Sequence, residues 1–547
     1  MRPAIEHLRH HFLQADTRGL AVFRLAFGLV ILGYLVSRVT GDSFVAFHTN
    51  QGVLPNHYAL FKPHMPYAWS FLYGVSTPSQ VAVVLGLFGV VFLCFTLGYR
   101  TRLFGALSLA CMVSLHHRMP LMVNGSMVMT HLLLLWSLAL PLGRHYSLDA
   151  WLRRRRGRPA PPLSHERVTS LGVLGFRLQL FFIYLFNVVH KTGETWMEGS
   201  AVHYVLWQDR IAMGPAVWIR EHAPSWFSPA ATYGTLVIEA LIALCLVLPL
   251  FPRHARRMAL AGMILLHGGI GLVVNLGPFP FVFPAAGLLM MASGDWTRFD
   301  HRVRRRLAPW VRERARKVAD ALRPSAEEAS PSTLRRLGWR VRPKVREAYY
   351  VAVIMLVAAV LRHDNPVLKE HLGPVGLPEP VRWTAQTLYV PQGWALFAPE
   401  APKLDGLLVL DGVLADGTRV DPLRHAPPDF DIMEHGPFGT DYFWQTYVPK
   451  LVMSQDEQLW KFFTDYALRI PEIEQWAGER ELVYLAAYYV GGERPRPDGE
   501  PVPEPTVELY TVRGRRPPGH TVPPGVPLPE VSSQEDSGDE RPRAEGP

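Results

Sequence analysis

The residue best suited by type and position to act in a reaction is Lys191. It follows a largely apolar run over residues 181–189 and stands between His190 and Trp196. An amine at the mouth of a hydrophobic helix is partly desolvated, which lowers its pKa until it can act as a base. More commonly, a lysine at a helix end extends its ammonium group to a membrane surface. The residues themselves leave both interpretations of Lys191 open, with the anchor favoured.

Four further ionisable side chains fall inside apolar segments, namely His131, Arg177, Glu239 and His267. With the topology derived below, they lie about 8 to 12 residues, or roughly 12 to 18 Å, from the cytoplasmic ends of their helices. Such a layer is either a structural Arg177–Glu239 ion pair or a relay between a site and the cytoplasm. The pair is favoured, because an unpaired buried charge is neutralised or expelled.

Windows of about 18 or more mostly apolar residues identify membrane-spanning helices. Residues 1–17 are polar and mixed in charge, and the first window continues as a full-length span without an A-x-A-like site at its end. We therefore expect the first span to be its own insertion signal. The third, eighth and ninth windows are the weakest. The nine windows are 19–38, 80–98, 103–115, 126–142, 170–190, 231–251, 258–275, 279–293 and 348–361.

The loops between these windows alternate in charge, which predicts their orientation. One set of loops holds 5 Lys/Arg in 94 residues, and the other holds 28 in 92. Basic loops stay in the cytoplasm, so the amino terminus is predicted to be cytoplasmic and residues after Arg362 to be outside. The segment 362–547 is acidic, with 17 Lys/Arg against 30 Asp/Glu, although the whole chain carries +9.

The composition argues against several classes of protein. The three cysteines fall inside predicted spans, so no disulfide framework is expected outside the membrane. Without a CxxC pair, an HExxH helix or a glycine-rich phosphate loop, no metal or nucleotide is expected. Basic runs at 153–156 and 302–317 adjoin spans, which favours contact with anionic lipid over nucleic acid.

The segment 363–515 changes to short strands and turns. Residues 404–421 predict a β-hairpin closed at Asp416-Gly417, followed by a helix over 454–470 and strands over 482–490 and 506–512. The tail, 516–547, is rich in Pro, Ser, Glu and Gly and is predicted to be disordered.

These patterns predict a mainly α protein: a polytopic transmembrane helical bundle of about eight or nine spans with a small β-rich extracytoplasmic C-terminal domain. A multi-pass position in an inner (plasma) membrane follows from the charge asymmetry, and the Pro- and Arg-rich composition suggests a bacterial source. The predicted parts are a cytoplasmic N-terminus (1–18), a transmembrane domain (19–295), a basic cytoplasmic loop (296–347), a last transmembrane helix (348–361), an extracytoplasmic α+β domain (363–515) and the tail (516–547).

Five short motifs in this order resemble the HTTM domain, the membrane region shared by vitamin K-dependent gamma-carboxylase and bacterial relatives. The resemblance covers about residues 17–295, and the ninth span with its β-rich domain is similar in arrangement to the carboxylase's lumenal part. The motifs are Leu20-Ala-Val-Phe-Arg24-Leu-Ala-Phe-Gly28, Leu97-Gly-Tyr-Arg100, Asn124, His190-Lys191 with Trp196, and Asn275-Leu-Gly277-Pro-Phe279.

The resemblance implies a chemistry. In the carboxylase, a Lys-Lys pair followed by Trp supplies the base that deprotonates reduced vitamin K. Oxygen then attacks, and the resulting alkoxide removes a proton from a peptide glutamate, which takes up carbon dioxide. Lys191 matches the second, catalytic lysine, so a reduced vitamin K or menaquinol would be the cofactor, without a metal, and a peptide or protein on the outer face would be the substrate.

Two departures from the family pattern limit this inference. The first lysine is His190 here, which replaces a permanent charge with a group that titrates near neutrality. The family's Asn-His reads Asn124-Gly125, so an imidazole is missing. His116 and His117 lie a few residues upstream on the same outer loop; they could substitute, but an interfacial role is favoured.

Two hypotheses therefore remain. The first is a quinol-dependent epoxidase or carboxylase in which Lys191 is the base, His190 tunes it, and Asn124 orients the quinol oxygen beside Trp196. The second is a non-catalytic membrane scaffold that binds a lipid, a quinone or an outer partner protein. The environment of Lys191 discriminates between them, because a base must face a closed pocket whereas an anchor points at lipid headgroups.

Overall fold

The computed structural model describes residue 6, residue 313 and residues 11–40, 43–61, 67–155, 166–306, 343–435, 441–454, 456–478 and 480–528. Most of the predicted basic loop over 296–347 lies outside these ranges. The end of the predicted tail, 529–547, also lies outside them.

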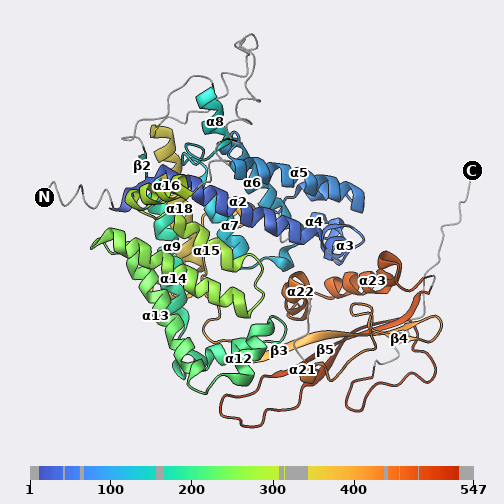
Figure 1. The fold of residues 1–547 in the computed structure, drawn as a ribbon. Helices are drawn as coiled ribbons and strands as arrows, with labels where there is room; N and C mark the ends of the chain where they lie inside the picture. The colour runs from blue at the N-terminus through green and yellow to red at the C-terminus, as the bar shows by residue number, and fades with distance from the viewer. Residues whose placement is uncertain are drawn as a thin grey trace, which may run out of the picture.

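Five of the described helices are long and apolar enough to cross a membrane (Figure 1). A sixth crossing is possible through α18 (Pro343–Asp364) and α19 (Pro366–Leu372), which meet at a bend of 77°. The five are α2 (Thr17–Val39), α5 (Pro78–Leu97), α9 (Leu171–His190), α13 (Phe227–Val247) and α14 (Pro252–Val273).

Three of the nine predicted spans correspond to shorter or more polar helices. The helices α7 (Gly125–Ser137) and α15 (Phe279–Leu288) have 13 and 10 residues, too few to cross about 30 Å of hydrocarbon. The helix α6 (Thr101–Arg118) has 18 residues but ends on His116, His117 and Arg118. By length and composition, the count is therefore five or six among the described residues.

The helix α7 lies in the centre of the bundle. Every side chain from Ser126 to Ser137 is buried, and its neighbours are α6, α9, α15 and α18. Its apolar sequence therefore reflects burial in protein, which the sequence pattern alone does not distinguish from contact with lipid.

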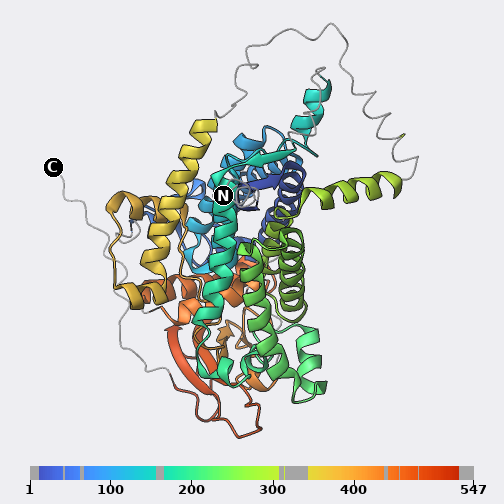
Figure 2. The same ribbon diagram turned by 90° about the vertical axis from the view of Figure 1, so that its left-hand side faces the viewer.

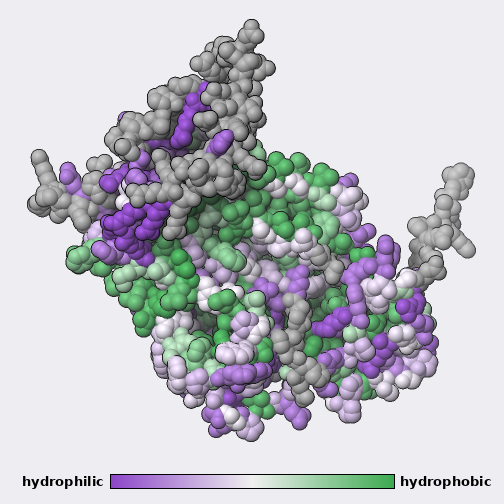
Figure 3. All heavy atoms as spheres, in the orientation of Figure 1, coloured by the Kyte–Doolittle hydropathy of each residue, from purple (hydrophilic) through white to green (hydrophobic). Residues whose placement is uncertain are grey.

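The spans at the edge of the bundle turn apolar side chains outward. Val83 and Leu87 of α5, Leu241 of α13 and Leu265 of α14 are all exposed. Figure 3 shows hydrophobic residues gathered over the helical bundle, whereas hydrophilic residues are more frequent over the sheet at the lower right. This distribution fits helices that face hydrocarbon.

Local sequence signals set the ends of α5. Thr77 and Gln80 form a capping box, with Pro78 in the first turn. At the other end, Gly98 adopts the left-handed conformation (φ 72°), which glycine reaches without strain. Arg24, which is fully buried in α2, donates to the Thr96 carbonyl in this last turn (3.1 Å) and so completes the cap.

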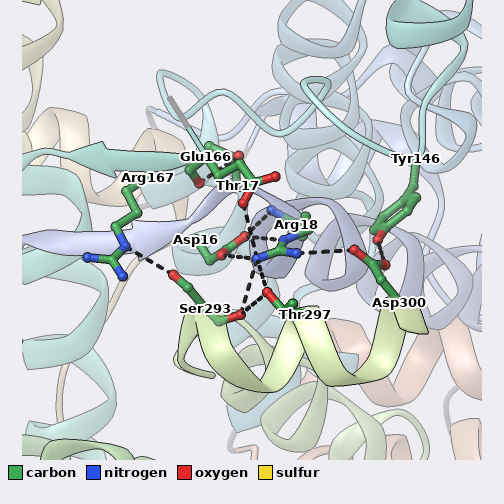
Figure 4. A network of polar contacts seen from close by, with 9 residues as sticks. All are labelled: Asp16, Thr17, Arg18, Tyr146, Glu166, Arg167, Ser293, Thr297 and Asp300. Atoms are coloured by element: carbon green, nitrogen blue, oxygen red, sulfur yellow. Dashed lines mark hydrogen bonds and ion pairs between the residues drawn. The ribbon is translucent and has the colours of Figure 1, made fainter. Parts of the chain in front are cut away.

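An ionic network joins the start of α2 to three other segments (Figure 4). Arg18 donates to Asp16 (2.9 Å) and Asp300 (3.1 Å) and lies 3.3 Å from Glu166. Asp300 belongs to α16 (Ser293–Arg306), and the strands β1 (Gln14–Asp16) and β2 (Arg167–Thr169) pair antiparallel beside the network. We call this end of the bundle the Arg18 end.

The C-terminal part of the chain contains a four-stranded antiparallel sheet in the order β4-β3-β5-β6. The strands β3 (Leu404–Leu414) and β4 (Arg419–Val420) form the predicted hairpin around Gly417, and β5 (Leu482–Glu493) and β6 (Thr506–Arg513) correspond to the other predicted strands. The helix α23 (Glu457–Glu474) packs on β5 and β6.

The helix α22 (Tyr442–Val452) lies between the sheet and the bundle, opposite the Arg18 end. It contacts the 3-10 helix η2 (Pro120–Met122) just before α7. Figure 2 shows α18 (yellow) along one side of the bundle and α16 (yellow-green) extending away from it. The other described elements are α3 (Ser43–His48), α4 (Asn56–Phe61), η1 (Phe71–Gly74), α8 (Leu148–Arg155), α10 (Glu194–Met197), α11 (Ala201–Leu206), α12 (Gly214–His222), α20 (Glu379–Leu388) and α21 (Ile432–His435).

Candidate functional site

Lys191 is the first residue after α9 and is buried, with its side chain only 4% exposed. Its Nζ donates to Oε2 of Glu239 on α13 across 2.5 Å. The same nitrogen lies 4.4 Å from the centroid of the Trp196 ring, in cation–π contact. Lys191 therefore does not point at lipid headgroups, and of the two environments predicted for it the structure has the enclosed one.

The predicted Arg177–Glu239 ion pair is not formed. Arg177 instead donates from Nη1 to the His11 carbonyl, in the half of α9 that lies toward the Arg18 end of the bundle. Glu239 is paired with Lys191, which follows the opposite end of the same helix. Arg177 and Lys191 are 14 residues apart, or roughly 21 Å along a helix, so one carboxylate does not serve both. The observed helices still begin at Leu171 and end at Val247, at similar distances from Arg177 and Glu239, so the missing pair reflects how α9 and α13 are shifted and rotated against each other.

A tyrosine and a histidine lie close to the Lys191–Glu239 pair. Tyr184 of α9 and His267 of α14 are joined through the tyrosine hydroxyl and Nε2 across 2.8 Å. Glu239 acts electrostatically on Tyr184, and Lys191 acts on His267. Two of the four residues of the predicted intramembrane layer, Glu239 and His267, thus lie near Lys191. Tyr184 also belongs to this group, although it was not predicted from the sequence.

His190 is held by the C-terminal part of the chain. Its Nδ1 donates to the Trp394 carbonyl across 3.0 Å, because a carbonyl only accepts. Neutral His190 therefore carries its lone pair on Nε2, which is buried with no hydrogen-bond partner among the described residues. The residue beside Lys191 is fixed in orientation and has one free acceptor.

The segment 397–401 covers the residues that follow Lys191. Gly193 N donates to the Pro399 carbonyl (3.0 Å), and Trp196 Nε1 donates to the Phe397 carbonyl (2.8 Å). Ala401 N donates in turn to Thr195 Oγ1 (2.9 Å). These bonds fix Trp196 over Lys191 and link the site to a segment about 200 residues later in sequence.

Asn124 caps the amino end of α7. Its Oδ1 accepts from Ser126 N across 3.1 Å, and its Nδ2 donates to the hydroxyl of Tyr442 on α22. A Cβ at Gly125 would lie 3.0 Å from Leu396, so the histidine that the family carries here has little room. The absence of a side chain at Gly125 thus allows the segment around Leu396 to approach the start of α7 closely.

The histidines at the end of α6 are buried rather than interfacial, which corrects the favoured interpretation. His116 Nδ1 and His131 Nε2 are 2.5 Å apart, and His131 Nδ1 donates to the Tyr389 carbonyl (3.0 Å). His117 Nε2 lies 3.1 Å from the Thr387 carbonyl. His131 therefore belongs to a separate pair and not to the group around Lys191.

A pocket of about 620 Å³ opens between α2, the turn before α15, and α22. Leu29 and Phe281 contribute apolar walls, and Tyr34, Asn275 and Tyr442 bring polar groups. Two of the motif segments meet here, because Asn275 lines the pocket and Asn124 binds the hydroxyl of Tyr442. Lys191 is not among the lining residues.

The pocket and His267 adjoin the same helix, α15. His267 stacks on Phe283 with ring centroids 4.4 Å apart and lies 5.1 Å from Phe279. Phe281 on the same helix and Pro278 at its N-cap line the pocket. Among the described residues, no group of three or more His, Cys, Asp or Glu side chains is arranged to hold a metal ion.

The apolar spans define a multi-pass membrane protein. Residues 12–296 match the model of the HTTM domain, and the chain belongs to this family. This match confirms the resemblance seen in the motifs at Arg24, Asn124, Lys191 and Asn275. No curated protein and no solved structure matched the chain.

Proposed function

We propose that this HTTM-family membrane protein is a quinol-dependent oxygenase of the gamma-carboxylase type, with Lys191 as its base. The observation that carries the proposal is the enclosed environment of Lys191, paired with Glu239 and covered by Trp196. The reaction class is the conversion of a quinol and O₂ into a quinone epoxide and water. Lys191 first passes the proton of its ammonium to the Glu239 carboxylate, and the neutral Nζ then accepts the proton of a quinol hydroxyl.

The electrostatics of Lys191 support a base. Burial lowers the pKa of Lys191, although the Glu239 carboxylate opposes this by stabilising the ammonium form. The balance favours an amine that exchanges its proton more readily than a solvated lysine does. Glu239 holds the proton that the ammonium gives up, so the neutral amine forms without an isolated charge inside the bundle.

The pocket fits a quinol in size and chemistry. Ligand pockets of about 300 to 1,000 Å³ are usually apolar with a few fixed polar groups. The walls from Leu29 and Phe281 would hold the ring system, and Tyr34, Asn275 and Tyr442 would hold its oxygens. Reduced vitamin K or menaquinol is therefore the proposed cofactor, and Asn124 orients it through Tyr442.

A peptide glutamate on the side of the sheet is the proposed second substrate. At the positions that serve carboxylation in the family, Gly125 replaces the imidazole and His190 replaces the first lysine. The free Nε2 of His190 next to Lys191 offers an acceptor at this position. His190 thus tunes the base in place of a second cation.

Two observations favour the alternative, a non-catalytic scaffold that binds a lipid, a quinone or a partner protein. The Nζ of Lys191 is already satisfied by Glu239, and Lys191 does not line the pocket. A lysine used only to hold α9 against α13 would show the same contacts. The two proposed functions differ in one measurable property: the oxygenase converts a quinol to its epoxide, whereas the scaffold does not.

Turnover is tested with purified protein in lipid vesicles supplied with reduced vitamin K and O₂, with the epoxide measured by chromatography. We expect wild type to form epoxide and Lys191→Ala to lose roughly 10²- to 10⁴-fold of the rate, as for loss of a general base. Lys403→Ala is the matched control, since Lys403 forms an exposed ion pair with Glu194 nearby. No epoxide from wild type, or equal rates from all three, contradicts the enzyme.

A further inference from the structure

Two arginines toward the Arg18 end of the bundle carry charges that no carboxylate of the described residues balances. Arg177 lies in the first half of α9 and is 1% exposed, and Arg256 is half-buried near the start of α14. The charged group that acts on Arg177 is Arg256, and the one that acts on Arg256 is a third arginine, Arg167. A guanidinium does not lose its proton inside a protein, so these charges persist.

We propose that Arg177 and Arg256 bind a phosphate group, of the kind carried by a phospholipid headgroup or by a soluble phosphate compound. The site is separate from the one around Lys191, which follows the opposite end of α9. It is also independent of the proposed oxygenase.

One backbone oxygen brings the two guanidiniums together. Nη1 of Arg177 and Nη2 of Arg256 both donate to the His11 carbonyl, the second across 2.8 Å. Two donors on one oxygen lie at most roughly 6 Å apart, because each hydrogen bond is about 3 Å long. A phosphate group has several acceptor oxygens and binds guanidiniums in charge-assisted hydrogen bonds, so a single phosphate can serve both arginines.

Most donors of the two arginines are unused. Each makes one hydrogen bond to another described residue, and the Nε of each is buried without a partner there. Arg24, which is fully buried in α2, differs: its three nitrogens donate to three backbone carbonyls. A buried arginine that only holds helices together is satisfied in this way. Arg177 and Arg256 instead keep donors for an acceptor that the described chain does not supply.

The nearby carboxylates are committed to other arginines. Asp295 accepts from Arg253 (3.0 Å) and from Arg257, the two arginines that flank Arg256 in the first turns of α14. The carboxylates around Arg18 belong to its own network. The charge of Arg256 is therefore in excess, although its neighbours on the same helix are paired.

Arg167 on β2 adds to this excess. Its Nε donates to the Ser293 hydroxyl across 3.1 Å, and Figure 4 shows its side chain turned away from Arg18. A neutral hydroxyl does not balance a guanidinium. The surplus positive charge at this end thus comes from three arginines, and an anion from outside the chain would neutralise it.

The surroundings of Arg256 favour a lipid as the source of the phosphate. Phe251 and Met258, at the same end of α14, are exposed apolar residues. In a membrane protein, a basic site beside apolar surface at the end of a span fits a phospholipid, whose phosphate lies at the level of the headgroups while its acyl chains follow the helix.

Binding is measured through the thermal midpoint of the delipidated full chain in a neutral maltoside detergent and a phosphate-free buffer. The probes are dioleoyl phosphatidylglycerol, inorganic phosphate, and dioleoylglycerol, which has the chains of the lipid without its phosphate. We expect phosphatidylglycerol to raise the midpoint of wild type by a few degrees in a saturable manner, because a ligand that binds only the folded state stabilises it. Dioleoylglycerol should leave the midpoint unchanged.

Arg177→Gln and Arg256→Gln test the two residues. The glutamine amide still has a donor for the His11 carbonyl but carries no charge. We expect each variant to weaken the apparent affinity for phosphatidylglycerol about 10-fold or more, as for loss of a charge-assisted hydrogen bond. Arg253→Gln is the matched control, since Arg253 lies on the same helix and its charge is balanced by Asp295. Its response to the lipid should follow that of wild type.

The midpoint without lipid separates binding from a structural role. Arg177→Gln removes a charge that has no counter-ion, so without lipid it should be at least as stable as wild type. An arginine that only holds helices together would instead lower the lipid-free midpoint and leave the response to the lipid intact, which would contradict the proposal.

Inorganic phosphate distinguishes the two sources of the ligand. An arginine-dependent shift with inorganic phosphate shows that the phosphate alone suffices, whereas a shift with phosphatidylglycerol only assigns the site to a lipid headgroup. The inference is overturned if neither probe shifts the midpoint of wild type, if dioleoylglycerol acts as phosphatidylglycerol does, or if both glutamine variants respond as wild type.

Discussion

Lys191 and Glu239 form a buried ion pair of 2.5 Å between the end of α9 and the middle of α13. Removing one member of a buried pair strands the other charge, which typically destabilises a protein by about 3 to 5 kcal/mol. We therefore expect Glu239→Gln to lower the thermal midpoint in detergent strongly. Glu194→Gln is the control, since its partner Lys403 is exposed and surface pairs contribute little.

The double variant Lys191→Met/Glu239→Leu removes both charges. Its expected midpoint lies well above that of Glu239→Gln, because no stranded ammonium remains. If the double variant is no more stable than Glu239→Gln, packing rather than the ion pair explains the loss.

Arg18 connects Asp16, Glu166 and Asp300 at the other end of the bundle (Figure 4). Arg18→Ala leaves the buried Asp16 carboxylate without this partner, so we expect a loss of roughly 3 kcal/mol in the free energy of unfolding. Limited proteolysis should cut earlier near α16, whose Asp300 and Ser293 carbonyl bind Arg18. Arg253→Ala, which breaks a more exposed pair with Asp295, should change both measurements far less.

The local part of the site could be predicted from sequence. The ends of apolar runs located Lys191 at a helix terminus, and Asn124 before α7 is a preferred N-cap residue. Hairpin chemistry at Asp416-Gly417 located the turn between β3 and β4. Each of these depends on neighbours a few residues away, which a single sequence contains.

The long-range part could not be predicted. Glu239 was assigned to Arg177 because depth was estimated from apolar windows, whereas the partner of a buried charge depends on how each helix is rotated and shifted. Tyr442 reaches Asn124 from 318 residues away, and the Arg38–Tyr34 contact depends on the face of α2 that turns inward. Nothing in local spacing encodes these choices.

Lys450 of α22 predicts a pH dependence of stability. Burial lowers the pKa of Lys450 from 10.5 to about 8 while its Nζ donates to the Val123 carbonyl. Between about pH 8 and 10.5 the unfolded chain binds more protons at this group than the folded chain, so stability rises with pH in this window and the penalty is fully present below it. The thermal midpoint of Lys450→Met should rise less from pH 8 to 10 than that of wild type.

Lys461→Met is the matched control for this titration, because Lys461 is exposed on the neighbouring helix α23. Its profile should follow that of wild type. Parallel profiles for wild type and Lys450→Met would show that other groups govern the stability in this range.

The basic loops predict that the sheet lies outside the membrane and α8 inside the cytoplasm. Thr418, in the exposed turn between β3 and β4, and Arg154, exposed on α8, are suitable positions for single cysteines. In intact cells, a membrane-impermeant maleimide should label Thr418→Cys at once and Arg154→Cys only after permeabilisation. The native Cys94, Cys111 and Cys245 lie within helices, and the unsubstituted protein gives the background. The opposite labelling pattern would invert the topology and place Lys191 and the segment that covers it on the cytoplasmic side.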